Sequence, residues 1–230
     1  MTTDEAPEER SERKRRDVLA AARRRFMIEG YASTGMEQVA RDASVSTATL
    51  YSYFPSKADL FQHVIEDAAG SFSRLITETA AVRGDSAAQL RAFAYAYARF
   101  MADPLARSVF RLVAAERRRF EPVARHFFER GRTDFGGTLI SILERLRGEG
   151  RVKIDKLSWA AGQLMGMIEH PTFLVPLVTG DEHKAERPIE DICDEAVRTF
   201  LARYATTKSQ DLWEEAGALP RPVDGASAEL

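Results

Sequence analysis

The sequence predicts an all-α fold, in which a small N-terminal domain of three helices with a helix-turn-helix precedes a larger helical domain. Apolar residues recur at steps of three and four along most of the chain, and Gly or Pro separates the resulting stretches. Only residues 152–154 alternate like a strand, and no second strand is available to pair with them. We expect about nine helices, with residues 1–9 as a disordered leader, 10–57 as the helix-turn-helix domain, 58–208 as the second domain and 209–230 as a flexible tail.

The first helix is expected over residues 11–29. Val18, Ala22 and Phe26 form its apolar stripe, and Gly30 would close it, because glycine accepts the left-handed backbone common after a helix end. A basic run from Arg10 to Arg16 opens the helix. Such a run ahead of a helix-turn-helix can contact phosphates or a minor groove, or can only keep the chain in solution. The charge pattern favours neither role.

Residues 34–57 have the pattern of two short helices joined by a turn. Thr34 is placed to cap a helix that starts at Met36, with Glu37 completing a capping box. Ser44-Val45-Ser46 interrupts the apolar spacing, and Ser46 can cap a second helix over residues 47–53. Pro55 ends this helix, because the residue before proline avoids helical backbone angles.

The second short helix presents small and hydroxyl-bearing side chains. A helix that enters the major groove needs short side chains near its N-terminus, and hydroxyls and methyls that meet phosphates and base edges. A polar helix facing only solvent would have the same composition. The residues expected to contact DNA are Thr34, Met36, Ser46, Thr47, Ala48, Thr49, Tyr51, Ser52, Tyr53 and Lys57.

The remaining helices follow from apolar periodicity and from their end signals. Ser56 can cap a helix that runs to about Val82, and Asp103-Pro104 is a strong N-terminal signal for another. Residues 152–154 are expected to be an extended connector. The expected helices cover residues 56–82, 86–102, 105–119, 121–147, 156–178 with an interruption near Pro171, and 188–206.

Many residues between about positions 13 and 65 stand in a specific order and spacing. They are Phe26, Gly30, Tyr31, Thr34, Met36, Val39, Ala40, Ala43, Val45, Ser46, Leu50, Tyr51, Phe54, Ser56, Lys57 and Leu60. In this order and spacing the sequence resembles the N-terminal domain of TetR-type transcriptional repressors. Two positions depart from the family pattern: Ser44 stands where glycine is common in the turn, and Tyr53 stands where many members carry histidine. The resemblance implies a repressor that a small molecule releases from a palindromic operator, and control of efflux is a candidate role.

Aromatic residues are concentrated between residues 93 and 135, where they could simply fill a helical core. Phenyl rings with a few polar groups also suit an apolar ligand. Residues 108–132 look similar to the C-terminal domain of AefR-like members of the same family, which implies a ligand-binding domain and a hydrophobic or aromatic inducer. The expected ligand-binding residues are Phe93, Tyr97, Phe100, Phe110, Phe127, Phe128 and Met165.

The last two expected helices carry small residues at steps of four and a long apolar stripe. Either feature could serve packing within one chain. The family resemblance implies instead that these helices join two copies of the chain, and a dimer also suits a palindromic site. The expected dimer-interface residues are Ala161, Met165, Ile192, Ala196 and Phe200.

Charge and composition limit the other functions. Residues 10–57 carry ten Lys or Arg against five Asp or Glu, a net charge of +5, so the rest carries −7 of the total −2. Basic charge is therefore concentrated where phosphate binding needs it. No stretch is apolar and long enough to span a membrane, the N-terminus does not resemble a signal peptide, and the single cysteine, Cys193, fits a reducing cytoplasm.

An enzyme and a protein-binding adaptor are the two alternative classes of protein. The four histidines are dispersed and no phosphate-binding or nucleophile motif is present, so we expect neither an enzyme nor a metal site or cofactor. A helical adaptor that binds only proteins is the second alternative. It predicts no affinity for DNA and no steep salt dependence.

Overall fold

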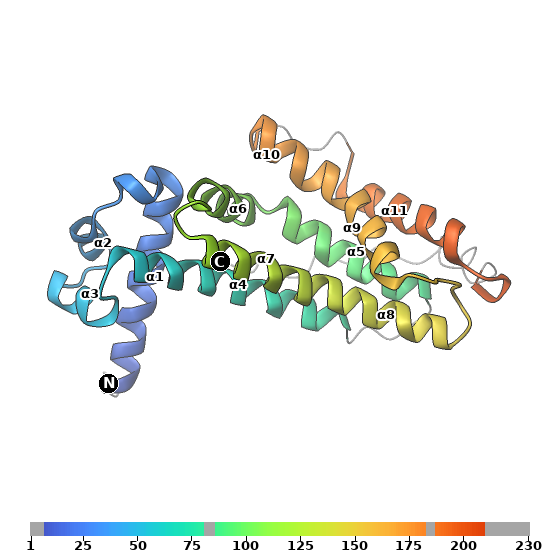
Figure 1. Cartoon of the computed structure of the whole chain (residues 1–230), viewed down its shortest axis with the longest axis horizontal. Coiled ribbons are helices and arrows are strands. Elements are labelled where there is room, and N and C mark those ends of the chain that lie inside the picture. Colours follow the sequence, from blue (N-terminus) through green and yellow to red (C-terminus); the bar gives the residue numbers. More distant parts are fainter. Residues whose placement is uncertain (1–6, 81–85, 183–186, 210–230) are drawn as a thin grey trace, which may run out of the picture.

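The computed structural model describes residues 7–80, 86–182 and 187–209. In these ranges the chain is helical, and its β-structure is one isolated antiparallel bridge between Val152 and Ala205. Figure 1 shows an elongated molecule with the N-terminal helices at one end and the later helices at the other. The all-α prediction is confirmed.

The N-terminal end of the molecule, called the head below, is built from α1 (Pro7–Ser33), α2 (Met36–Asp42) and α3 (Thr47–Tyr53). α1 begins four residues earlier than the sequence predicts. Gly30 has φ 78°, which breaks the helix where the sequence places its end. Val18, Phe26 and Leu50 are buried in a core that the three helices share.

The turn between α2 and α3 contains a left-handed residue. Ser44 has φ 55°, the only positive φ outside glycine among the described residues. The Ser44 amide donates to the carbonyl of Arg41, and the Val45 amide donates to that of Ala40. Serine thus adopts the backbone that the family's usual glycine would adopt more easily, and the tight turn is retained.

α4 (Lys57–Ala80) connects the head to the rest of the molecule, called the body below. The Ser56 hydroxyl accepts a hydrogen bond from the Asp59 amide at 3.1 Å, so the predicted N-cap is confirmed. Leu60, Phe61 and Ile65 are buried in the head core, and the helix also packs against the body. Its expected end near Val82 lies outside the described residues.

The body helices lie close to the predicted ranges. Two predicted helices contain π-helical turns: one interrupts the stretch predicted at residues 121–147, and the other stands at the interruption expected near Pro171. The elements are α5 (Ser86–Ala102), α6 (Pro104–Glu116), α7 (Glu121–Gly131), η1 (Arg132–Gly136), α8 (Gly137–Gly148), α9 (Leu157–Glu169), η2 (His170–Leu174), α10 (Val175–Thr179) and α11 (Ile189–Tyr204).

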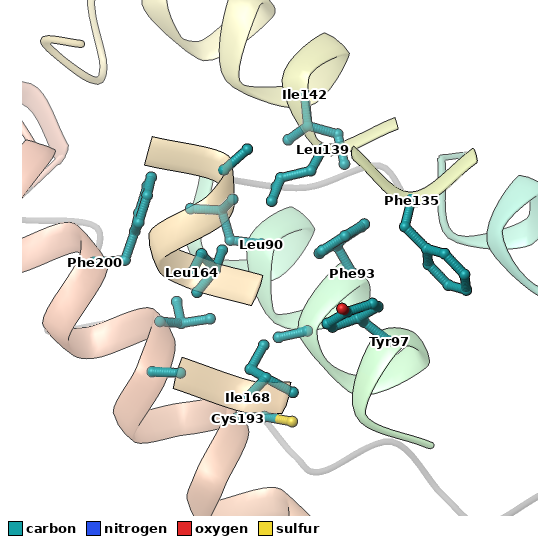
Figure 2. Close-up of a cluster of buried hydrophobic side chains, with 14 of the residues drawn as sticks. Leu90, Phe93, Tyr97, Phe135, Leu139, Ile142, Leu164, Ile168, Cys193 and Phe200 are labelled. Atoms are coloured by element: carbon teal, nitrogen blue, oxygen red, sulfur yellow. The ribbon is translucent and has the colours of Figure 1, made fainter. Parts of the chain in front are cut away.

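The body has its own apolar core, formed mainly by α5, α8, α9 and α11. Figure 2 shows Leu90, Leu139, Leu164 and Phe200 converging there. The connector after α8 is extended, as expected, and it is held by α11: the Lys153 amide donates to the Tyr204 carbonyl at 2.8 Å. Residues 1–6 of the expected leader and 210–230 of the expected tail lie outside the described residues.

Candidate functional site

α3 has one buried side and one exposed side. Ser46 caps the helix as predicted, because its hydroxyl accepts a hydrogen bond from the Thr49 amide at 3.0 Å. Leu50 is fully buried, whereas Tyr51 is 48% exposed. Thr47, Ala48 and Ser52 are also exposed. A short helix held from behind by its apolar side can therefore present hydroxyl and methyl groups to a groove.

Tyr53 lies at the end of α3 and is half-buried. Its hydroxyl is 2.9 Å from the hydroxyl of Ser11 in the first turns of α1. The residue therefore fixes the position of α1 against α3, besides its expected contact with DNA.

Thr34 does not cap α2 as predicted, and its side chain is buried where a contact with DNA was expected. Its side chain is 2% exposed and donates a hydrogen bond to the Gly30 carbonyl at 2.8 Å. The Thr34 amide donates to the same carbonyl at 3.3 Å, so the hydroxyl makes the bond to the carbonyl four residues earlier that threonines in helices commonly make. Gly35 occupies the N-cap position of α2 and no side chain caps the helix, so the capping box with Glu37 does not form. Met36 is half-buried against the head core.

Lys57 caps the C-terminal end of α1 with its side chain. Its ammonium donates to the carbonyls of Ala32, at 2.9 Å, and Thr34, at 2.7 Å, and lies 4.7 Å from the ring centroid of Tyr31. Burial, followed by the nearby charge of Arg119, lowers the pKa of Lys57. An ammonium has three protons, so one remains for a phosphate, and the expected DNA contact of Lys57 stays a prediction.

A hollow of about 700 Å³ opens on the head beside α3. Tyr51 and Lys57 line it together with Arg25 and Arg41. Arg25 is held in place by Asp42, with a hydrogen bond of 2.6 Å from its Nε. Sequence periodicity did not single out Arg25 or Arg41, because neither belongs to an apolar stripe or to the exposed side of α3.

The turn between α6 and α7 contacts the head directly. Phe120 stacks on Phe61 of α4, with 4.6 Å between ring centroids, and meets the edge of Tyr31 at 4.9 Å. The guanidinium of Arg119 also lies against the Tyr31 ring. Arg119 and Phe120 are far from Tyr31 in the sequence, so local periodicity does not predict this contact.

Three of the expected ligand-binding residues form one buried aromatic group in the body. Phe93, Tyr97 and Phe100 are each at most 5% exposed. Tyr97 stacks on Phe93 and meets the edge of Phe135, with centroid distances of 5.9 and 5.1 Å, and Phe100 stacks on Phe135 at 4.8 Å. Figure 2 shows the Tyr97 hydroxyl within this core.

The body core also contains buried polar groups, and Glu169 is the one that pairs with a ring of this group. Burial and hydrogen bonding to Glu169 raise the pKa of Tyr97, and burial raises the pKa of Glu169. The Tyr95 hydroxyl is buried without a hydrogen-bond partner among the described residues, and burial raises the pKa of this group to about 12. Burial also raises the pKa of the Cys193 thiol to about 12, which disfavours the reactive thiolate form.

The other expected ligand-binding residues do not belong to that group. Phe110 meets the edges of Phe127 and Phe173, at 5.0 and 4.8 Å, and Met165 packs half-buried against the body core. Phe127 also lines a cavity of about 280 Å³ between α4 and α7. Phe128 is 66% exposed, so the prediction that it lines an internal cavity is wrong: the helix turns Phe127 inward and its neighbour outward.

The predicted dimer interface is also wrong in most of its residues. Ala161, Ile192, Ala196 and Phe200 are at most 9% exposed within a single chain, because α9 and α11 pack against α5 and each other along these positions. Met165 is half-buried. The apolar side chains that remain exposed on α9, η2 and α10 are Trp159, Leu174, Val175 and Val178.

The fold and the exposed side of α3 define a helix-turn-helix protein with an attached all-helical body. Comparison with known proteins gives the family. Residues 18–64 match the model of the bacterial regulatory proteins of the tetR family, and residues 88–206 match the C-terminal domain of AefR-like transcriptional repressors. The chain belongs to the TetR family: it is a DNA-binding transcriptional regulator and not an enzyme.

Solved structures of the same family are similar over most of the chain. A TetR-family regulator from Mesorhizobium loti MAFF303099 is 25% identical, with a TM-score of 0.72, over 86% of this chain and 99% of the other. The flavonoid-responsive regulator FrrA is 30% identical, with a TM-score of 0.67, over 85% and 99%.

A curated relative is similar over a shorter stretch. The transcriptional regulator HbdR from Aromatoleum sp. (strain CIB) is 32% identical over 65 residues, which is 28% of this chain and 28% of the relative.

Among the described helices, none combines the length and the apolar character that a membrane crossing requires.

Proposed function

We propose that the chain is a ligand-responsive repressor that binds a palindromic operator as a homodimer in the cytoplasm and leaves it when a hydrophobic or aromatic small molecule binds. Members of this family bind operator DNA, dimerise and bind small molecules. The observation that carries the proposal is the exposed side of α3, where Thr47, Ala48, Tyr51 and Ser52 stand clear of the core.

The two heads of the dimer would read two half-sites about 34 to 36 Å apart, one turn of the double helix. We place the dimer interface on the exposed apolar side of α9 and α10. A Cβ added to Gly162 or Gly166 would meet no atom within 4 Å, so the outer side of these glycines is open to a second helix. Trp159 and Val178, 68% and 76% exposed, would be covered there.

The inducer would bind among the aromatic rings of the body. The two π-helical turns support this site, because such turns are frequent at functional sites. Phe135 lies in η1 and contacts the Phe100 ring, and Phe173 lies in η2 and contacts the Phe110 ring. The likeness to a regulator described as flavonoid-responsive supports an aromatic ligand with hydroxyl groups. Tyr97 and Glu169 would supply its polar partners.

Ligand binding would reach the head through the turn between α6 and α7. A ligand that separates the Phe110 ring from the Phe173 ring would displace α6, which carries Phe110. The turn after α6 would move with it, and Arg119 and Phe120 of this turn contact Tyr31 of the head. Displacing the head changes the spacing of the paired heads. The coupling is reciprocal, so operator DNA must weaken ligand binding by the same factor.

The experiment is a titration of DNA from upstream of the protein's own gene and its neighbours, with footprinting to locate the site. We expect protection of a palindrome, two chains on each duplex, and release on addition of an aromatic effector, with the flavonoid naringenin as the first probe. An efflux gene beside the site would fit a drug-like or phenolic inducer. Absence of DNA binding in all these regions would favour the protein-binding adaptor instead.

A further inference from the structure

The first turns of α1 extend beyond the core of the head. α1 begins at Pro7, and Val18 is the first residue that is fully buried. Four cations lie on this stretch with their side chains exposed: Arg10, Arg13, Lys14 and Arg16. The basic run is therefore helical, and it differs from the extended arm that often precedes a helix-turn-helix.

Two contacts fix this extension to α3. The Ser11 hydroxyl lies 2.9 Å from that of Tyr53, and the guanidinium carbon of Arg15 lies 5.5 Å from the ring centroid of Phe54. Both contacts are made at the C-terminal end of α3. A helix held at two successive turns presents its other side chains in a defined direction.

The helical spacing of 100° per residue sorts the charges around this extension. Ser11, Arg15 and Val18 share the side that faces the head. Arg10 and Lys14 occupy one flank of that side, and Asp17 follows on the same flank about one turn after Lys14. Glu8 and Glu12 occupy the opposite flank, and Arg13 and Arg16 point further away. The flank of Arg10 and Lys14 is therefore positive over the first turns of α1, up to Asp17, and the opposite flank is negative.

The extension also has a defined place relative to the proposed dimer. Figure 1 shows the N-terminal end of α1 running past α3 on the side of the molecule opposite α10. If the exposed side of α9 and α10 joins two copies, the two extensions lie at the outer ends of the paired heads. Long cationic side chains there would meet backbone phosphates beyond the bases that α3 reads.

We propose that the helical extension of α1 is a second DNA-binding element, in which Arg10 and Lys14 bind backbone phosphates at the outer ends of the operator. This inference rests on the proposed function. It gives the protein a longer footprint than α3 alone requires, and it strengthens binding without reading sequence, because phosphate contacts carry no base information.

The test compares two double variants with the same loss of charge on the same helix. Arg10→Ala/Lys14→Ala removes the proposed contacts, and Arg13→Ala/Arg16→Ala is the matched control. Each phosphate contact contributes about 0.9 to the slope of log affinity against log salt. Two residues in two protomers should therefore lower the magnitude of that slope by about 3 to 4 in the first variant, and by less than about 1 in the control.

Duplex length gives an independent readout. Trimming the base pairs outside the half-sites should weaken binding of the wild-type protein and of the control, and should leave the Arg10→Ala/Lys14→Ala variant unchanged. Ser11→Ala, which releases one of the two fixing contacts and leaves the charges in place, should give an intermediate loss of affinity.

The outcomes separate the two proposals. A wild-type chain that binds no duplex removes the proposed function and this inference with it. A wild-type chain that binds its operator, with equal slopes for the two double variants and no effect of trimming, overturns this inference alone. Because all four altered side chains are exposed, circular dichroism should show the same thermal unfolding for both variants and the wild type.

Discussion

The guanidinium carbon of Arg119 lies 4.6 Å from the ring centroid of Tyr31, a residue of the head that is only 3% exposed. Lys57 approaches the same ring at 4.7 Å, and Phe120 meets its edge. A tyrosine of the head is thus enclosed by a turn of the body. Side-chain contacts of this kind give the body a direct means of setting the position of the head.

Phe120→Ala should destabilise the protein by about 2 kcal/mol. Truncating a fully buried phenylalanine costs about 3 to 5 kcal/mol, and Phe120 is only partly buried. Urea unfolding followed by circular dichroism measures the difference. Phe128→Ala on the neighbouring helix is the control and should change stability by less than about 0.5 kcal/mol, because its ring is 66% exposed. Equal losses of unfolding free energy in the two variants would contradict the proposal that Phe120 stabilises the contact between the body and the head.

Ser44→Gly should stabilise the chain by about 0.5 to 1 kcal/mol. The left-handed backbone of Ser44 costs a residue with a side chain about 1 to 2 kcal/mol, and glycine does not bear this cost. Glycine loses more conformational entropy on folding, which offsets part of the gain. Ser52→Gly, within α3, should have the opposite sign, with a loss of about 0.5 kcal/mol. Thermal unfolding of both variants decides whether Ser44 is strained; a lower Tm for Ser44→Gly would count against it.

Trp159→Glu should weaken self-association. A large aromatic side chain at the centre of an interface contributes about 2 kcal/mol or more, so the dimer dissociation constant should rise by at least about 30-fold. Sedimentation velocity over a range of concentrations measures this change. Phe128→Glu introduces the same charge at an equally exposed ring elsewhere and should leave the dimer intact. A wild-type chain that is monomeric at all concentrations would exclude the proposed dimer.

Asp181→Asn should lower stability by about 2 kcal/mol near neutral pH. Arg107, 4% exposed, donates from Nε to Asp181 at 2.6 Å, and Arg111 donates to the same carboxylate at 2.8 Å. Breaking a buried ion pair costs about 3 to 5 kcal/mol, and the smaller value reflects a carboxylate that is about one-third exposed.

The pH dependence gives a second test of the same contact. Burial alone would raise the pKa of Asp181, but the hydrogen bonds from Arg107 and Arg111 outweigh it and hold this pKa below its ordinary value. The stabilisation is therefore complete above about pH 4, the ordinary value for aspartate, and is lost as the pH falls through the lowered pKa. Unfolding free energies of the wild type and Asp181→Asn should converge in acid; a constant difference down to pH 2 would argue against the ion pair.

The sequence alone predicted the helices well where local signals agreed. Ser46, Ser56 and Asp103 each cap a helix as expected, and α5 spans the predicted residues 86–102. These predictions depend on neighbours within one turn. The prediction that Thr34 caps α2 was wrong because its hydroxyl bonds back to the Gly30 carbonyl four residues earlier, a local alternative to capping that the sequence pattern does not distinguish.

The candidate site was harder to predict because periodicity identifies an apolar side without saying what covers it. Ala161, Ile192, Ala196 and Phe200 have the spacing of a dimer interface and are buried within one chain, whereas Trp159 and Val178 lie outside that stripe and are exposed. The contact of Arg119 with Tyr31 joins residues far apart in the sequence, and no spacing rule predicts it.

The most direct test of the account is the affinity of the wild-type chain and of Tyr51→Ala for the footprinted operator, measured by fluorescence anisotropy over a series of salt concentrations. Tyr51 is 48% exposed, so its loss should leave the fold intact and weaken operator binding by about 10- to 100-fold. The wild type should bind as two chains per duplex with a steep salt slope. Operator affinity that is unchanged in Tyr51→Ala, or a wild-type slope near zero, would contradict the assignment of α3 as the element that reads DNA.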